Sequence, residues 1–203
     1  MEYRGVKRAS VEKNIRTPQR FFNAQTARVL KRDGIAVIPT DTLYGIVGSA
    51  LSKKAVFRIY RLRKRNTQKP MIVLIGSYAQ LRRFGIAPDA QFKKFLNDFW
   101  PGKVSVVLPC TSPKFRYLHR GTKSVAFRMP RPTPLRRLLV KTGPLVAPSA
   151  NLEGEPPAKT IAEAKKYFGN RVDFYIDAGK MDSLPSTLVT LRGGKVVVLR
   201  KGA

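Results

Sequence analysis

Short apolar runs and amphipathic segments follow one another along this chain and predict its secondary structure. Apolar runs bounded by turn residues indicate buried strands, and apolar residues spaced three and four apart indicate helices. The predicted helices span residues 17–33, 52–62, 77–85, 88–99, 133–141 and 160–168. The predicted strands span residues 35–38, 71–75, 103–108, 124–129, 145–147, 172–176, 188–191 and 196–199.

Local signals at the ends of these segments sharpen the prediction. Thr17 followed by Pro18 is typical of a helix start, and Thr160 with Glu163 forms a capping-box pattern. Residues 40–48 are expected to form a loop. Early strands alternate with helices, whereas the last two flank Arg-Gly-Gly as a hairpin. This order predicts an α/β fold, a mixed sheet with helices on its faces.

The polar, basic residues 1–16 show no apolar period and are expected to form a flexible N-terminal arm. Residues 17–203 then form a single domain, a size that suits one core.

Only one cysteine, Cys110, and one histidine, His119, occur among the 203 residues. An internal disulfide, a multi-cysteine zinc site and a His-pair metal motif are therefore excluded. No apolar run approaches the ~20 residues of a membrane span, and the N-terminus lacks the apolar core of a signal peptide. We expect a cytoplasmic protein without a membrane partner.

The charge is unusual, because the chain has 40 Lys and Arg residues but only 12 Asp and Glu residues, which gives a formal net charge of +28. Such a balance indicates polyanionic partners, but basic residues spread over the whole surface would give the same value. Both interpretations stay open from composition alone.

Polar residues follow several predicted strands, where open α/β sheets bind ligands. The sequence PTDTLYG at residues 39–45 brings hydroxyls, a carboxylate and a phenol into one loop, which could also be an ordinary turn. The segment at residues 58–69 is strongly basic, and it suits either phosphate oxygens or a solvated helix end. Weaker candidates are Ser149 with Asn151, Arg128, Ser186 and Arg200.

Several nucleotide-binding and hydrolase patterns are absent from the sequence. Neither the P-loop nor the Rossmann glycine fingerprint occurs. A Ser-His-Asp site would need His119, and no nucleophile elbow accompanies it.

In their order along the chain, eight segments resemble the YrdC-like threonylcarbamoyl-adenylate synthases. They are PTDTLYG (39–45), IYRLRKR (59–65), KP (69–70), WPG (100–102), AFRMP (126–130), PSAN (148–151) with Gly154, STLV (186–189) and VLRKGA (198–203). The resemblance covers residues from about 21 to the C-terminus. It implies a twisted open sheet with a basic concave cavity.

The resemblance further implies an enzyme, a nucleotidyltransferase that condenses L-threonine, bicarbonate and ATP to threonylcarbamoyl-AMP and pyrophosphate. That product serves threonylcarbamoyladenosine modification of tRNA through a downstream threonylcarbamoyl transferase complex. Magnesium is expected to accompany ATP, and Asp41 and Asp177 are the candidate carboxylates near it. The alternative is a non-catalytic or paralogous protein of the same fold that binds double-stranded RNA.

Residue roles also follow from the resemblance. The K-x-R motif falls on Arg63 and Arg65, and the S-x-N motif falls on Ser149 and Asn151, the four expected catalytic residues. Threonine is expected to contact Thr40, Tyr44 and Arg128. The nucleotide is expected to contact Lys69, Ser186 and Arg200 in addition to the four catalytic residues. Arg63 stands where the family has lysine, and Lys69 stands where many members have histidine, so charge is kept while reach and geometry differ.

Overall fold

Alternate residues of the strand β1 (Ile35–Pro39) pack into two different cores. Ile35 and Val37 belong to one core and Ala36 and Ile38 to the other, because successive side chains of a strand point to opposite faces. All four are fully buried, so both faces of the sheet are covered at this strand. A run of apolar residues without polar alternation is the sequence sign of such a strand.

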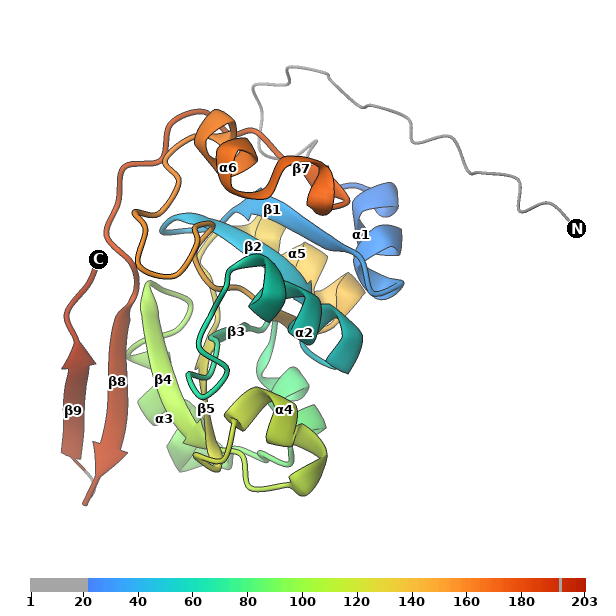
Figure 1. Ribbon diagram of the computed structural model, residues 1–203. Helices are drawn as coiled ribbons and strands as arrows, with labels where there is room; N and C mark the ends of the chain where they lie inside the picture. The colour runs from blue at the N-terminus through green and yellow to red at the C-terminus, as the bar shows by residue number, and fades with distance from the viewer. Residues whose placement is uncertain (1–21, 194) are drawn as a thin grey trace, which may run out of the picture.

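The computed structural model describes residues 22–193 and 195–203, and in them one sheet has nine strands in the order β7-β1-β2-β6-β3-β5-β4-β8-β9 (Figure 1). Parallel pairs join β1 to β7, β3 to β5 and β4 to β8, and the other neighbours are antiparallel. After β1 the strands are β2 (Tyr44–Ser49), β3 (Val73–Leu74), β4 (Val104–Pro109), β5 (Ser124–Arg128), β6 (Leu145–Val146), β7 (Phe174–Tyr175), β8 (Thr187–Arg192) and β9 (Lys195–Arg200).

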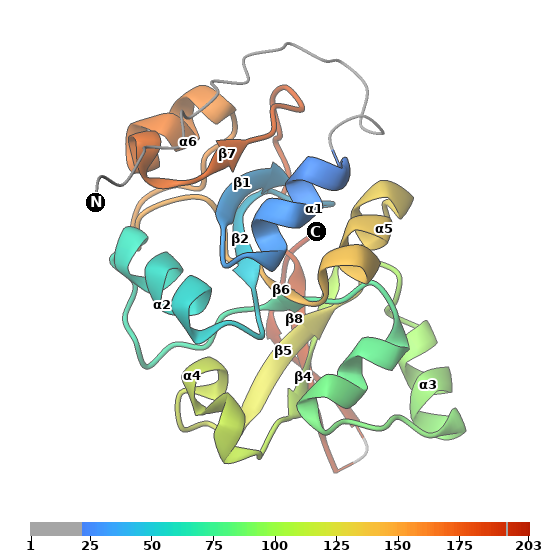
Figure 2. The ribbon, with the colours of Figure 1, turned by 90° about the vertical axis from the view of Figure 1, so that its right-hand side faces the viewer.

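Helices cover both faces of this sheet. Figure 2 shows α1 and α5 side by side on one face, where their leucines pack on the core that contains Ile38. Apolar residues of α2 and α6 pack into the other core. The helical segments are α1 (Ala24–Lys31), α2 (Lys53–Leu62), η2 (Tyr78–Phe84), α3 (Ala90–Asn97), η3 (Pro113–Phe115), α4 (Arg116–His119), α5 (Thr133–Thr142), α6 (Ile161–Phe168) and η4 (Gly169–Arg171).

The predicted mixed α/β sheet with helices on its faces is confirmed, and so are several helix starts. Ser52, Asp89 and Thr160 are N-caps whose side chains accept hydrogen bonds from backbone N–H groups in the first turn. The C-terminal hairpin also forms as predicted, and β9 lies at the edge of the sheet (Figure 1).

Several predictions about the type or bounds of elements are wrong. The first helix begins at Ala24, because the Asn23 side chain caps it by accepting from the Thr26 N–H at 2.9 Å. Residues 113–119, where no helix was predicted, form a short 3₁₀ turn followed by α4. The strand expected at residues 172–176 is only Phe174–Tyr175. The arm predicted at residues 1–16 lies outside the described residues.

Residues 44–48, expected in a loop, form most of β2, an interior strand of the sheet. Glycines at 45 and 48 weaken the strand signal, but the fold needs a small residue at 48. A Cβ there would lie 3.0 Å from Ile35 Cγ2 and 3.2 Å from Ala55 Cβ, where α2 packs against the sheet. The close approach of this helix therefore explains the glycine that obscured the strand.

In the part of the chain that the structure describes, no helix has the length and apolar character needed to cross a membrane.

Candidate functional site

The end of α2 directs Arg63 into the interior, where it meets the loop that follows β6. Arg63 is the C-cap of α2, whose buried residues hold the helix against β2. Its Nε donates to the Asn151 carbonyl at 3.0 Å, and its Nη2 donates to Asn151 Oδ1 at 3.0 Å and to Ser149 Oγ at 3.4 Å. Ser149 Oγ in turn donates to Asn151 Oδ1 at 2.6 Å. The structure thus brings three of the four expected catalytic residues into one hydrogen-bonded cluster.

One nitrogen of the buried Arg63 guanidinium, Nη1, has no hydrogen-bond partner within the protein, although the residue is only 3% exposed. Burial, and next the positive charge of Arg65, lowers the pKa of Arg63 to about 10, so the group still carries its charge at neutral pH. A buried donor without a partner is costly, and such groups mark sites where a ligand supplies the missing acceptor. An anion is the ligand that this nitrogen suits.

The Asn151 side chain is fully used within its own loop. Its Nδ2 donates to the carbonyls of Leu152 and Glu155, both at 2.7 Å. Its Oδ1 accepts from Arg63 and Ser149. Asn151 therefore holds Arg63 and Ser149 in place, and direct contact with a nucleotide stays a prediction.

The basic loop that follows Arg63 is fastened by Glu153, a residue that the sequence reasoning missed. The Glu153 N–H donates to the Arg63 carbonyl at 2.8 Å, and its carboxylate accepts from the Asn66 N–H and lies 3.0 Å from Lys69 Nζ. The Asn66 bond, followed by Lys69, lowers the pKa of Glu153. An acidic residue two positions after Asn151, in a chain with only 12 Asp and Glu residues, was the available signal.

Arg65 and Lys69, both expected at the nucleotide, lie on this loop. Their side chains are already bonded to neighbouring groups of the protein. Arg65 donates to the carbonyls of Lys69 at 3.3 Å and Pro70 at 3.0 Å. Tyr60 also donates its hydroxyl to the Lys69 carbonyl at 2.9 Å. Lys69 itself is exposed and pairs with Glu153. Both cations border the Arg63 cluster, but neither belongs to it.

A second group of residues gathers around Arg128 at the end of β5. Arg128 and Asp41 are both 4% exposed in their side chains and form an ion pair with 3.1 Å between Nη2 and Oδ1. Arg128 Nη1 also donates to Thr42 Oγ1 at 3.3 Å, while its buried Nε has no partner in the protein. Burial lowers the pKa of Arg128, although Asp41 opposes this shift. A substrate carboxylate at Arg128 would share the guanidinium with Asp41.

Thr40 and Tyr44, the other residues expected to hold threonine, already use their hydroxyls in hydrogen bonds within the protein. Thr40 Oγ1 donates to the Leu43 carbonyl at 2.7 Å, within the turn. The Tyr44 hydroxyl donates to the Gly179 carbonyl at 2.7 Å and accepts from the Ala178 N–H at 2.8 Å. Burial raises the pKa of Tyr44 to about 12. Tyr44 therefore anchors the loop after β7 to β2, and its contact with threonine stays a prediction.

Ser186 and Arg200 form a third group, at the start of β8 and the end of β9. Ser186 is buried with its Oγ 2.9 Å from Ser105 Oγ, and Arg200 donates to the Ser186 carbonyl at 2.7 Å. Arg200 is close enough for its charge to lower the pKa of Arg128. The third group therefore lies within electrostatic reach of the second.

The first and second groups meet at Gly45, where the loops at residues 40–44 and 148–151 converge. The Ile46 N–H donates to the Pro148 carbonyl at 3.0 Å, and the Ala150 N–H donates to the Tyr44 carbonyl at 2.8 Å. A Cβ on Gly45 would lie 3.3 Å from Thr40 Cγ2 and 3.5 Å from the Pro148 carbonyl oxygen. The loops that carry Thr40 and Ser149 therefore lie against each other at the start of β2.

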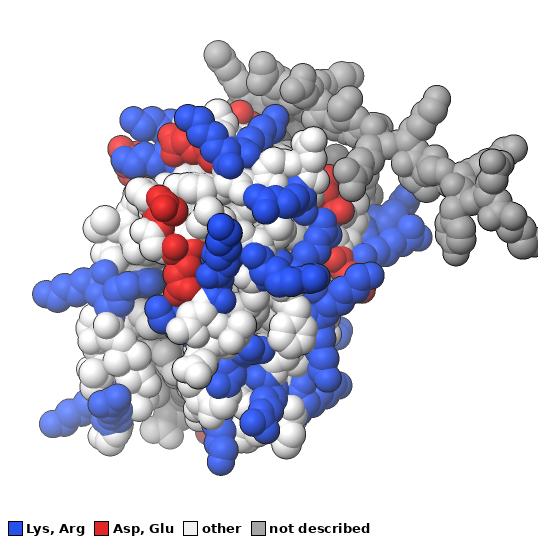
Figure 3. All heavy atoms as spheres, in the orientation of Figure 1, with Lys and Arg blue, Asp and Glu red and all other residues white. Residues whose placement is uncertain are grey.

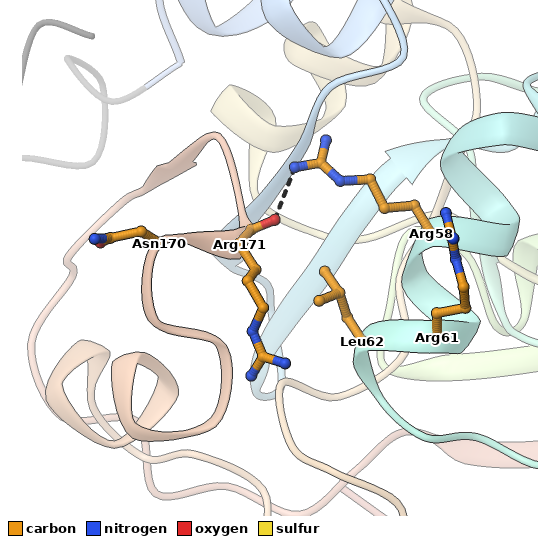
Figure 4. Close-up of a pocket in the computed structure, with 5 residues that line it drawn as sticks. All are labelled: Arg58, Arg61, Leu62, Asn170 and Arg171. Atoms are coloured by element: carbon orange, nitrogen blue, oxygen red, sulfur yellow. Dashed lines mark hydrogen bonds between the residues drawn. The ribbon is translucent and has the colours of Figure 1, made fainter.

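Two basic hollows are lined by residues other than the four expected catalytic residues. The larger, about 500 Å³, is lined by Arg58, Arg61, Leu62, Asn170 and Arg171, and Figure 4 shows Arg58 reaching the Arg171 carbonyl. The other, about 430 Å³, lies between α2 and α4. The basic cavity implied at Arg63 and Ser149 stays a prediction. No group of three His, Cys, Asp or Glu residues that could hold a metal occurs in the described ranges, and Asp41 and Asp177 belong to separate clusters.

Comparisons with known proteins find relatives over most of the chain. The Sua5/YciO/YrdC family model, described as telomere recombination, matches residues 28–202. A threonylcarbamoyl-AMP synthase of Thiobacillus denitrificans is 32% identical over 169 residues, which cover 83% of this chain and 90% of that protein.

Two solved structures share the fold. Sua5 of Pyrococcus abyssi complexed with L-threonine aligns with a TM-score of 0.79 and 29% identity, covering 88% of this chain and 53% of that one. This chain therefore spans about half the length of the Pyrococcus protein. YciO of E. coli aligns with a TM-score of 0.76 and 26% identity over 91% of this chain and 90% of that one. By its matched residues and its fold, this chain belongs to the Sua5/YciO/YrdC family.

Proposed function

We propose that this chain is an enzyme that forms threonylcarbamoyl-AMP and pyrophosphate from L-threonine, bicarbonate and ATP. The observation that carries the proposal is the buried Arg63 guanidinium, which Ser149 and Asn151 hold in place and which keeps one donor free. A relative named for this activity and a relative solved with L-threonine support it.

The chemistry has two steps. Bicarbonate takes up a proton and loses water to give carbon dioxide. The amine of threonine attacks this carbon dioxide and releases a proton, which leaves a carbamate. A carbamate oxygen then attacks the α-phosphorus of ATP, the bond from that phosphorus to the bridging oxygen breaks, and pyrophosphate leaves. Neither step needs a nucleophilic side chain, so positioning and stabilisation of charge carry the catalysis.

The chain offers groups for each requirement of this reaction. Arg63 would stabilise negative charge on the reacting phosphate, with Arg65 and Lys69 nearby for the leaving phosphates. Arg128 would hold the threonine carboxylate beside Thr40 and Tyr44. Ser186 and Arg200 would contact the nucleotide. Magnesium would enter as part of the ATP substrate.

Further parts of the proposal concern the product and the setting. The nucleotidyltransferase class follows from the transfer of an adenylyl group. The product would pass to a threonylcarbamoyl transferase complex that modifies tRNA in the cytoplasm. These statements rest on the family resemblance.

The alternative is a paralogue of the same fold that binds RNA without catalysis, which the high positive charge favours. Phosphate-backbone binding does not require the buried set of Arg63, Ser149 and Asn151, so this set favours the enzyme. Release of pyrophosphate from ATP separates the two. The enzyme requires both threonine and bicarbonate, whereas release that is independent of threonine contradicts the proposal.

A further inference from the structure

The hollow of about 430 Å³ between α2 and α4 combines several cations with exposed aromatic surface. Its volume is in the range of sites that hold a small molecule or one unit of a polymer, roughly 300–1,000 Å³. Its wall includes Lys53 and Phe57 of α2, Lys114 of η3, and Arg116 and Arg120 at the two ends of α4. Its lining contains no acidic residue.

Aromatic rings and cations are interleaved in this wall. Phe57 is 41% exposed, unusual for a large apolar side chain on a helix whose other apolar residues are buried or partly buried. The Arg120 guanidinium lies 5.5 Å from the Phe57 ring centroid and 4.9 Å from that of Tyr60. Lys53 Nζ lies 5.9 Å from the centroid of Tyr117. The rings are therefore fixed among positive charges, with one ring open to a ligand.

Among the residues that the structure describes, these cations have no carboxylate partner. The four ion pairs found in residues 22–193 and 195–203 involve other cations, namely Arg58, Lys69, Arg128 and Lys159. The sequence of α2 contains no acidic residue at all. Figure 3 shows Lys and Arg gathered over the area where α2 and α4 lie in Figure 1. Unneutralised charge of one sign attracts a polyanion.

We propose that this hollow binds an unpaired nucleotide of a single-stranded nucleic acid. The base would stack on the exposed surface of Phe57, and the flanking phosphates would contact Lys53, Lys114 and Arg116. Single-strand sites elsewhere combine a basic groove with an aromatic platform, because every base has a flat face to stack. The bases of a duplex are already stacked on each other, so a duplex cannot use Phe57 in this way.

The proposed site borders the Arg63 cluster without including it. Thr67 and Gln68, which also line the hollow, belong to the loop that carries Lys69, and Arg120 Nε donates to the Thr67 carbonyl. The side-chain hydrogen bonds of Arg63, Ser149 and Asn151 do not involve Phe57, Lys114 or Arg116. The proposal does not rest on the synthase activity, and variants at these three residues separate the two.

A tryptophan at position 57 provides a direct reporter, because the chain has one other tryptophan, Trp100, which is buried. We expect oligouridylate to quench the fluorescence of Phe57→Trp, and an abasic strand of equal length to leave it unchanged. Phe57→Leu keeps an apolar side chain but removes the platform, so affinity should fall roughly five-fold to a hundred-fold. Comparison with oligodeoxyuridylate, which has the same base, shows whether the sugar contributes.

Charge is tested with two matched double variants. Lys114→Ala with Arg116→Ala should weaken binding and reduce the slope of log affinity against log salt by about 1.4, since each single-strand phosphate contact contributes about 0.7. Lys31→Ala with Arg32→Ala removes two exposed cations at the end of α1, on the opposite face. Synthase activity and the melting temperature should stay unchanged in both pairs. Equal weakening by the two pairs, or stronger binding of duplex RNA or of an acidic peptide than of oligouridylate, would overturn the proposal.

Discussion

At the residue scale, Arg63 performs two tasks with one side chain. Its Nε and Nη2 hold the loop at residues 149–151, and its Nη1 is left for a ligand. The sequence marks Arg63 as a motif residue but does not reveal the first task, because its partner Asn151 lies 88 positions away. A lysine has one nitrogen at the same place and cannot make both sets of contacts with equal geometry.

Two substitutions of Arg63 test separately the positive charge and the branched shape of its guanidinium group. Arg63→Ala removes a buried cation and should lower the turnover of pyrophosphate release by roughly 10²–10³-fold, as loss of one preorganised donor does in other enzymes. Arg63→Lys keeps the charge and should retain more activity than Arg63→Ala. Steady-state kinetics at saturating threonine and bicarbonate measure both. Turnover of Arg63→Ala at the unsubstituted level would remove this residue from the proposed chemistry.

Ser149 and Asn151 should respond differently to truncation. Asn151→Ala leaves the buried Arg63 and two backbone carbonyls without their partner, so it should lower the free energy of unfolding by ~1–3 kcal/mol as well as lowering activity. Ser149→Ala should lower activity with little change in stability, because Ser149 is only partly buried. Denaturant unfolding and pyrophosphate release on the same samples check this. Equal stability of the two variants would contradict the positioning role of Asn151.

At the scale of elements, patterns that repeat locally were predictable and contacts between distant segments were not. The helix from Lys53 to Leu62 follows from Ser52 and its apolar spacing, and both are local. The strand β2 was missed because its two glycines weaken the strand signal. Gly45 closely approaches Thr40 of the preceding loop, and Gly48 closely approaches Ile35 of β1 and Ala55 of α2. For the same reason the sequence named Arg128 but not its ion pair with Asp41, and it gave no role to Glu153.

The packing of α2 on β2 makes Gly48 sensitive to a single methyl group. In Gly48→Ala the added Cβ would press on Ile35, Ala55 and Ile59, at 3.0 to 3.2 Å, so overpacking should cost ~1–3 kcal/mol of stability. Gly85→Asn is the control, because Gly85 has a φ of +78°, open space around it, and a conformation that asparagine tolerates. Thermal unfolding compares them. A Gly48→Ala protein as stable as the control would show that α2 can shift without cost.

At the scale of the whole molecule, positive charge is distributed among sites of different character. Arg63 and Arg128 are buried and held by specific partners, whereas the cations around the hollow between α2 and α4 are exposed or bordered by solvent. The formal net charge of +28 therefore combines buried and exposed cations at separate places in the molecule. The predicted arm at residues 1–16 adds five cationic residues and two acidic ones, in the part of the chain outside the described residues.

Removal of residues 1–16 tests whether the arm contributes to binding of RNA. The truncated chain should bind RNA more weakly with a shallower salt dependence, because each lost phosphate contact removes about 0.7 to 0.9 from the slope. Pyrophosphate release should be unchanged, since no residue assigned to that reaction lies in the arm. Filter binding at several salt concentrations and the kinetic assay measure the two effects. Loss of pyrophosphate release with unaltered RNA affinity would place the arm at the active site instead.

The formation of a threonylcarbamoyl adenylate is tested most directly by mass spectrometry of the reaction products with ¹³C-labelled bicarbonate. With ATP, L-threonine and labelled bicarbonate present, we predict threonylcarbamoyl-AMP that carries one ¹³C atom, with an equal amount of pyrophosphate. Omission of threonine or bicarbonate should abolish both products, and Arg63→Ala should reduce them in parallel. Pyrophosphate without a labelled adenylate, or neither product with all three substrates present, would contradict the proposed function.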